Sequence, residues 1–195
     1  MNRNVERGAA TRAHLIEVAT RLFSERGYDG TSIEAVLAES GASRGALYHH
    51  FPGKDALFWA VGEGVGCRIG AQVLAAMEGA GDPVAELRAG LLAWIRLACD
   101  PDVRQIVLID APAVFGWQRW RELDEQGNLG AIRAALAYAA EQGRLDPGHV
   151  ETFAHTILAA ANEVAMMIAR AEDPAAAVSA EERAFAAFLD RLLGD

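Results

Sequence analysis

Apolar residues recur every three or four positions along almost the whole chain, and no segment keeps the apolar and polar alternation of a half-buried strand. This spacing predicts an all-α protein with about nine helices, each carrying an apolar stripe. We expect helices at about 11–26, 31–40, 43–51, 54–77, 83–99, 102–110, 114–126, 129–142, 147–170 and 174–193. The pattern leaves open whether the two helices on either side of Gly127 and Asn128 are one.

Glycines mark one helix end and weaken another helix. Gly27 follows the apolar stripe of the first helix and can stop it in the left-handed conformation. The expected helix 54–77 contains Gly62, Gly64, Gly66 and Gly70. Each costs about 1 kcal/mol relative to alanine in an exposed helix, so this helix should depend on packing or bend.

Two of the expected helices are joined by a very short turn. Thr31 is expected to cap the first of them, and Glu34 can reach back to complete a capping box. Gly41 lets the chain turn sharply, and Ser43 caps the second helix at once. Residues 31–51 thus have the form of a helix-turn-helix, whose second helix enters the major groove of DNA. An ordinary helical hairpin would give the same caps and turn.

The second of these helices carries side chains that suit DNA. Arg44 can pair with guanine through two hydrogen bonds, Gly45 allows close approach, and the Ala46 methyl can contact a thymine methyl. Leu47 and Phe51 should face inward and hold the helix in place. The candidate phosphate contacts are Thr31, Ser32, Tyr48, His50 and Lys54, and the full set of candidate DNA-binding residues adds Ser43, Arg44, Gly45, Ala46 and His49.

The stretch TSIEAVLAESGASRGALYHHFPGKDALF, residues 31–58, resembles the DNA-binding region of the TetR family of bacterial transcriptional regulators. The positions that carry the resemblance are Gly41, Ser43, Leu47, Tyr48, His50, Phe51, Lys54 and Leu57. The resemblance implies a homodimer in which a three-helix helix-turn-helix domain, residues 1–55, binds DNA. A helical domain, residues 56–195, would bind a small effector, dimerise and change the distance between the two DNA-binding domains.

The net charge of −9 argues at first against nucleic acid, but its distribution changes that conclusion. Residues 1–55 hold seven Lys or Arg and seven Asp or Glu, whereas residues 56–195 hold eleven and twenty. The net acidity therefore lies outside the N-terminal quarter. A local cationic face remains compatible with this balance, built from Arg3, Arg7, Arg12, Arg44 and Lys54.

Patterns typical of catalysis, cofactors or metals are missing from the sequence. We find no paired acids at a plausible site, no phosphate loop and no nucleophile with an evident base, so we expect neither enzyme activity nor a cofactor. Cys67, Cys99, His149 and His155 fit no metal-binding spacing. No apolar run approaches the length needed to cross a bilayer and no secretory signal begins the chain, so we expect a cytoplasmic protein without membrane contact.

Dimerisation is expected because one short helix reads only a few base pairs, and a two-fold operator requires two copies. The helix at 147–170 is apolar on more than one face, which indicates two neighbours. The candidate interface residues are Phe153, Ile157, Val164, Phe185, Phe188, Leu189 and Leu192. Periodicity equally allows both faces to be buried within one subunit, and the resemblance favours the dimer.

Aromatic residues gather at 110–124, and Trp94 lies on the helix before them. Aromatic walls with a few polar groups suit a small apolar or aromatic effector. The candidate pocket residues are Trp94, Asp110, Phe115, Trp117, Arg119, Trp120, His155, Asn162 and Met166. His155 and Asn162 share one face of their helix, and if buried they need a partner from an effector or from the other subunit.

We therefore expect a ligand-responsive repressor that binds a palindromic operator as a dimer and is released by a small effector. Such an effector acts only through its different affinity for two conformations. Two other hypotheses remain open from the sequence. One is a DNA-binding regulator controlled by a protein partner, with the aromatic segment as an interface; the other is a helical small-molecule carrier.

Overall fold

The computed structural model describes residues 3–193, and the side chains of residues 6–193. Arg3, one of the candidate cations, lies outside the described side chains. Over this range the chain forms α1 (Arg3–Gly30), α2 (Ile33–Ser40), α3 (Arg44–His50), α4 (Lys54–Met77), α5 (Pro83–Leu97), α6 (Ala111–Phe115), α7 (Trp117–Glu141), α8 (Val150–Arg170) and α9 (Pro174–Leu193). A π-helix, η1 (Val103–Asp110), precedes α6, and a 3₁₀ turn, η2 (Pro147–His149), precedes α8. The described residues include no strand, which confirms the all-α prediction.

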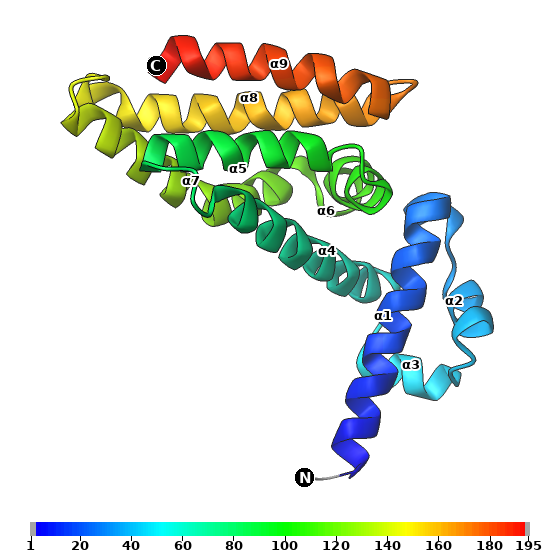
Figure 1. Cartoon of the computed structure of the whole chain (residues 1–195). Coiled ribbons are helices and arrows are strands. Elements are labelled where there is room, and N and C mark those ends of the chain that lie inside the picture. The colour runs from blue at the N-terminus through cyan, green and yellow to red at the C-terminus, as the bar shows by residue number, and fades with distance from the viewer. Residues whose placement is uncertain (1–2, 194–195) are drawn as a thin grey trace.

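Helices α1, α2 and α3 form a unit that we call the head. Leu15, Leu22 and Phe23 of α1 are fully buried and share one core with Leu47 of α3 and with Phe51, which follows it. Figure 1 shows α2 and α3 on the side of α1 that faces away from the remaining helices. The outer surfaces of α2 and α3 are therefore open to a partner.

The first helix breaks at Gly27, where φ is 71°, as predicted, but the cap of the following helix differs from the prediction. Thr31 is 1% exposed, and its hydroxyl donates to the carbonyl oxygens of Leu22 and Gly27 at 3.1 and 2.9 Å. It satisfies carbonyls near the helix end and cannot cap α2. Ser32 is the N-cap instead, accepting a hydrogen bond from the Ala35 amide at 3.1 Å. The predicted capping box at Thr31 is therefore wrong.

Helices α4 to α9 form the body. α4 leads from α1 of the head to a stack in which α8 packs against α5, α7 and α9, with α9 as the outermost layer (Figure 1). By length and composition alone, the segment Pro147–Arg170 could cross a membrane, so the expectation that no segment reaches this length is too strong. Half of its most apolar window is buried inside the structure, as in the core helix of a soluble protein.

α7 continues through Gly127 and Asn128, so the two helices expected there are one. The segment between α5 and α7 is less regular. The π-helix η1 gives way to the short α6, which ends at Gly116 with φ of 85°. Irregular helical turns of this kind often lie at functional sites. Here they lie between the head and the interior of the body, since η1 packs against both α1 and α8.

Candidate functional site

The outer surface of α3 is polar and well anchored. Ser43 caps the helix as predicted, accepting a hydrogen bond from the Ala46 amide at 3.2 Å. Leu47 and Phe51 are 0% and 2% exposed and fix the inner face, whereas the Tyr48 side chain is 45% exposed. The other candidates on this helix are Arg44, Gly45 and His49, which are exposed, and Ala46 and His50, which are half-buried.

Arg44 is held by an ion pair at the front of this surface. Its guanidinium donates to a carboxylate oxygen of Glu34 on α2 at 3.0 Å. Hydrogen bonds from the backbone amide of Glu34 itself and from Arg44 lower the pKa of this carboxyl. Both side chains are more than half exposed, so the pair joins α2 to α3 through a weak, solvent-screened contact. A guanine edge can replace Glu34 as the partner of Arg44.

The candidate phosphate contacts differ in how well they are placed. Ser32 is exposed at the start of α2, whereas Thr31 is buried and presents almost no surface to a phosphate. The Lys54 ammonium lies 3.9 Å from the centre of the Tyr28 ring, whose hydroxyl donates to Asp55. Burial, followed by the bond to Asp55, raises the pKa of Tyr28 to about 12. Lys54 thus lies on the boundary between head and body.

The body contains a cavity of about 660 Å³. One side is formed by α4, where Gly62, Gly66 and Gly70 lie one helical turn apart. A Cβ added at any of the three would meet no atom within 4 Å, so the absence of side chains leaves open space there. Sequence reasoning interpreted these glycines only as helix-weakening residues. Their four-residue spacing on one helix face was the signal that could have located the cavity.

Aromatic residues form much of the remaining lining. Trp94, Phe115 and Trp120 from the candidate set contribute to it, and so does Trp59 of α4, which the sequence did not single out. The indole N–H of Trp120 donates to the Val107 carbonyl at 3.0 Å. The indole nitrogen of Trp94 is buried and has no hydrogen-bond partner among the described residues. A buried N–H without an acceptor is costly, which makes this wall of the cavity polar at one point.

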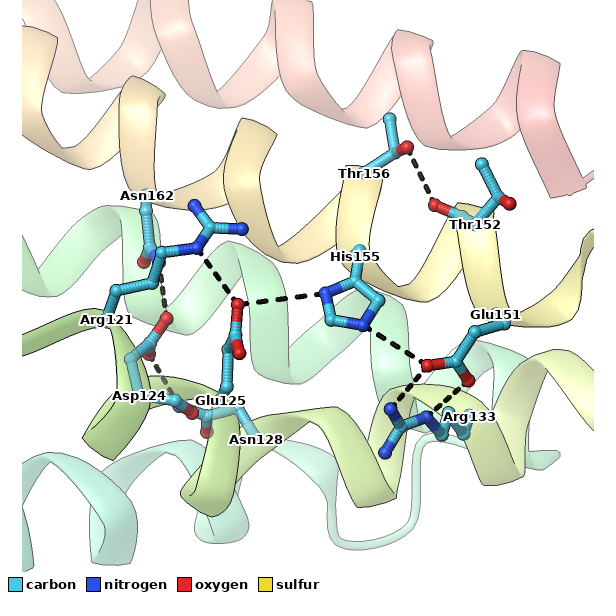
Figure 2. Close-up of polar contacts among 10 residues, drawn as sticks. All are labelled: Arg121, Asp124, Glu125, Asn128, Arg133, Glu151, Thr152, His155, Thr156 and Asn162. Atoms are coloured by element: carbon cyan, nitrogen blue, oxygen red, sulfur yellow. Dashed lines mark hydrogen bonds and ion pairs between the residues drawn. The ribbon is translucent and has the colours of Figure 1, made fainter. Parts of the chain in front are cut away.

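A carboxylate lies at the other polar point of the cavity. Asp124 of α7 accepts hydrogen bonds from the Asn162 amide at 2.6 Å and the Asn128 amide at 2.8 Å (Figure 2). All three residues line the cavity. Burial raises the pKa of the Asp124 carboxyl, and the two amide hydrogen bonds only partly offset this effect. Asn162 was predicted to need an effector or the other subunit, but its partner lies in the same chain.

Five candidate pocket residues lie elsewhere. Trp117 is 49% exposed and stacks on Trp120, and Arg119 lies over the ring of Trp59 at 4.6 Å, outside the lining. Met166 is buried but does not reach the cavity. His155 contacts Glu125 at 3.7 Å and Glu151 at 3.2 Å in a surface network (Figure 2). The structure places these residues outside the cavity lining, because helical spacing alone does not give the direction of each face.

Asp110, the fifth, connects the body to the head. One carboxylate oxygen accepts from the Tyr28 backbone N–H at 2.7 Å, and the other accepts from the Gln105 amide at 3.0 Å. Aromatic packing forms a second connection. Phe58 contacts Phe23 of α1 at 4.9 Å and Phe115 of the cavity wall at 5.5 Å between ring centres. Phe58 thus contacts both the cavity wall and the head.

The predicted dimer residues divide into two groups. Ile157, Phe185 and Leu189 are at most 3% exposed and belong to the core of this subunit, which leaves them almost no surface for a second copy. They pack where α8 meets α5, α7 and α9, as the one-subunit alternative allowed. Phe188 is 37% exposed, and Phe153, Val164 and Leu192 are half-buried. Only these four retain surface for a second copy.

No group of three or more His, Cys, Asp or Glu within the described residues could hold a metal ion. Cys67 is exposed and Cys99 half-buried, and both are free thiols.

Two family models match the chain. Residues 15–61 match the one described as bacterial regulatory proteins, tetR family, and residues 84–192 match the one described as Tetracyclin repressor-like, C-terminal domain. The HTH-type transcriptional regulator AcrR of Shigella flexneri is 33% identical over 99 residues, 50% of this chain and 46% of AcrR. The HTH-type transcriptional repressor AcnR of Corynebacterium efficiens is 28% identical over 142 residues, 69% of each chain. The match thus spans less than half the length of AcrR.

Solved structures are similar over nearly the whole length. A TetR-family transcriptional regulator from Pectobacterium atrosepticum is 29% identical with a TM-score of 0.81, covering 100% of this chain and 99% of the other. AibR, solved in complex with isovaleryl coenzyme A and operator DNA, is 22% identical with a TM-score of 0.66 over 94% of this chain and 98% of its own. At this identity AibR shows the shared fold alone.

Proposed function

Because the chain belongs to the TetR family of bacterial regulatory proteins, we propose that it is a cytoplasmic, effector-controlled repressor that binds a palindromic operator as a homodimer. Relatives are named as transcriptional regulators and repressors, which supports this role over catalysis. The observation that carries the proposal is the α3 surface, where Tyr48 and Arg44 face outward while Leu47 is fully buried beneath them.

DNA binding by this surface follows from the chemistry of its residues. The N-terminal part of α3 meets base edges, with Arg44 as the main hydrogen-bond donor and Gly45 allowing close approach. A Cβ added at Gly45 would meet no atom of the protein within 4 Å, so the space in front of it is open to a groove of the DNA. Tyr48 and His49 then contact phosphates, and so do the first backbone N–H groups of α2 and α3, next to Ser32 and Ser43. These contacts fix the register of the protein on the duplex.

The second copy is proposed to pack on the outer faces of α8 and α9. Phe188, Met167 and the half-buried Val164 present apolar surface there, and α9 is the outermost layer of the body. Two heads on one dimer would then bind half-sites about one helical turn of DNA apart. We place the division between the DNA-binding domain, residues 1–55, and the effector and dimerisation domain, residues 56–195, within the first turn of α4.

Effector control would use the two connections between cavity and head. Phe115 lines the cavity and stacks on Phe58, while Asp110 at the end of η1 holds the backbone of Tyr28. A ligand that prefers one position of α6 shifts the head with it, because an effector acts through its different affinity for two states. AibR, which has the same fold, was solved with both a coenzyme A thioester and operator DNA.

The test begins by selecting bound duplexes from a random pool with the purified protein. Arg44→Ala should weaken binding to the selected duplex roughly tenfold or more and relax its sequence preference at one position in each half-site. Arg133→Ala is the matched control, since Arg133 also forms an exposed ion pair, with Glu151 at 2.6 Å, but on the body. If both variants bind alike, or no two-fold sequence is selected, the proposal fails.

Salt titration separates phosphate contact from other causes. The logarithm of the binding constant should fall by about 0.9 per unit of log salt for each phosphate neutralised. Lys54→Gln should reduce this slope by about one contact without changing the selected sequence. An unchanged slope would remove Lys54 from the phosphate contacts.

A further inference from the structure

The charged residues that line the cavity are all acidic. Glu63 of α4 and Asp124 of α7 belong to the lining, and no Lys, Arg or His among the described residues does. Arg119 lies over the lining residue Trp59, and Arg121 acts on Asp124 through its charge, but neither arginine belongs to the lining. An anionic ligand would therefore meet two carboxylates and no cation of the lining, which is unfavourable.

Asp124 is placed to accept a cation. Its oxygens accept hydrogen bonds only from the neutral side-chain amides of Asn162 and Asn128, and it forms no ion pair with any described residue. Arg121, one turn before it, donates instead to Glu125 at 2.9 Å (Figure 2). Asp124 is half-buried, and the charge of Arg121 lowers its pKa less than burial raises it. A cation from a ligand would offset the remaining cost of the partly desolvated carboxylate.

The aromatic walls favour the same kind of ligand. Trp59, Trp94, Phe115 and Trp120 line a cavity whose other surface is mainly apolar. Ring faces attract a positive charge, most strongly in tryptophan, while their area binds an apolar skeleton. A cavity of about 660 Å³ fits a drug-sized molecule.

On the premise of effector control proposed above, we infer that the cavity takes a lipophilic cation, an apolar or aromatic molecule with a positively charged nitrogen that pairs with Asp124 and Glu63. The apolar skeleton occupies the space left by the α4 glycines. Free fatty acids and coenzyme A thioesters, which carry negative charge, are disfavoured as ligands by the two carboxylates of the lining.

Three probes with one chain and different charge test the inference: decyltrimethylammonium, decanol and decanoate. Binding to the whole protein is measured by calorimetry and by the fluorescence of the lining tryptophans. The cation should bind at least tenfold more tightly than decanol, and decanoate should bind most weakly. Gly66→Leu, which fills the open side of the cavity, should abolish binding of the cation and the alcohol alike.

Charge-removing variants locate the pairing. Decyltrimethylammonium has no N–H to donate, so its attraction to the carboxylates is purely electrostatic. Asp124→Asn should weaken its binding about 10-fold. Glu63→Gln should weaken it by a smaller factor, at most about 5-fold, because Glu63 is exposed, and both variants should leave decanol unchanged. Glu63→Gln is included because Glu63 is exposed and its replacement leaves the core intact. Circular dichroism melting of each variant checks that the fold survives.

The outcomes separate this inference from the proposed function. If decanol or decanoate binds as tightly as the cation, if no probe binds, or if both variants weaken all probes equally, the inference is overturned. Release of the selected operator duplex by a bound neutral or anionic probe would keep effector control while refuting the cationic ligand. Cation-selective binding that leaves operator affinity unchanged would uphold the ligand class and refute effector control.

Discussion

Gly62, Gly66 and Gly70 allow the stability cost of the cavity to be measured. All three lie inside α4, and an alanine methyl at each would enter open space. Glycine in a helix interior is roughly 0.5–1 kcal/mol less stable than alanine. The triple alanine variant should therefore raise the free energy of unfolding by about 1.5–3 kcal/mol. For a chain of this size, the melting temperature should rise by roughly 3–12 °C.

Gly143 provides a control of opposite sign. A methyl there also meets no atom within 4 Å, but φ is +72°, which an alanine adopts only at a cost. Gly143→Ala should lower the free energy of unfolding by about 1 kcal/mol, since steric space is equal and only the backbone conformation differs. At Gly90 the added methyl would lie 3.0 Å from the Met77 side chain, so its gain in helix propensity should be partly lost.

Urea and thermal unfolding followed by circular dichroism measure both signs. The triple variant should also bind effector more weakly, because three methyl groups enter the cavity, while its affinity for operator DNA stays the same. A triple variant that melts below the parent, while Gly143→Ala behaves as expected, would refute the claim that α4 is a regular helix beside open space. A more stable variant with unchanged effector affinity would refute the assignment of this cavity as the effector site.

Three further predictions concern other parts of the molecule. Asp110→Asn removes the charged acceptor of the Tyr28 amide and should lower the free energy of unfolding by about 1–3 kcal/mol. In a DNA-binding titration the variant should keep its operator affinity and lose part of its response to the effector. An unchanged response to the effector would disprove the coupling of cavity and head through Asp110. The pKa of Asp124 is raised in the folded protein, so its contribution to stability is full below the ordinary value of 3.8 and is lost as pH rises through the raised value. The unfolding free energy of the parent minus that of Asp124→Asn should accordingly fall from below pH 3.8 toward neutral pH, and a constant or rising difference in pH-dependent urea unfolding would contradict the assigned cause. Phe188→Glu, at a side chain 37% exposed on α9, should reduce the sedimentation mass from two subunits to one with the helical spectrum retained, and a mass of two subunits would place the interface elsewhere.

The head was predictable because its signals are local. Ser43, Gly41 and the inward spacing of Leu47 and Phe51 act within a few residues of one another, and each was found in its expected role. The cap at Thr31 was predicted wrongly although its surroundings are also local. Thr31 and Ser32 are both suitable caps, and the free carbonyls of Leu22 and Gly27 at the end of α1 take the Thr31 hydroxyl, which leaves Ser32 to cap α2.

The cavity was only partly predictable because aromatic composition does not give direction. Trp117 and Trp120 lie three residues apart and stack on each other, yet only Trp120 lines the cavity. His155 and Asn162 share a helix face, but one meets surface carboxylates and the other meets Asp124. The α4 glycines form part of the cavity because they carry no side chains, so a search for functional side chains overlooks them.

The glycine-rich part of α4 lies next to the head. Gly62 follows Phe58 by one turn, and Phe58 packs between Phe23 of α1 and Phe115 of the cavity wall. A wall of close-packed leucines would resist displacement, since packed interiors transmit strain and do not deform gradually. A helix with open glycine faces, stabilised mainly by its neighbours, can change position when a ligand supplies the missing contacts. We therefore expect the low intrinsic stability of α4 to be the property that lets cavity occupancy alter the position of α3.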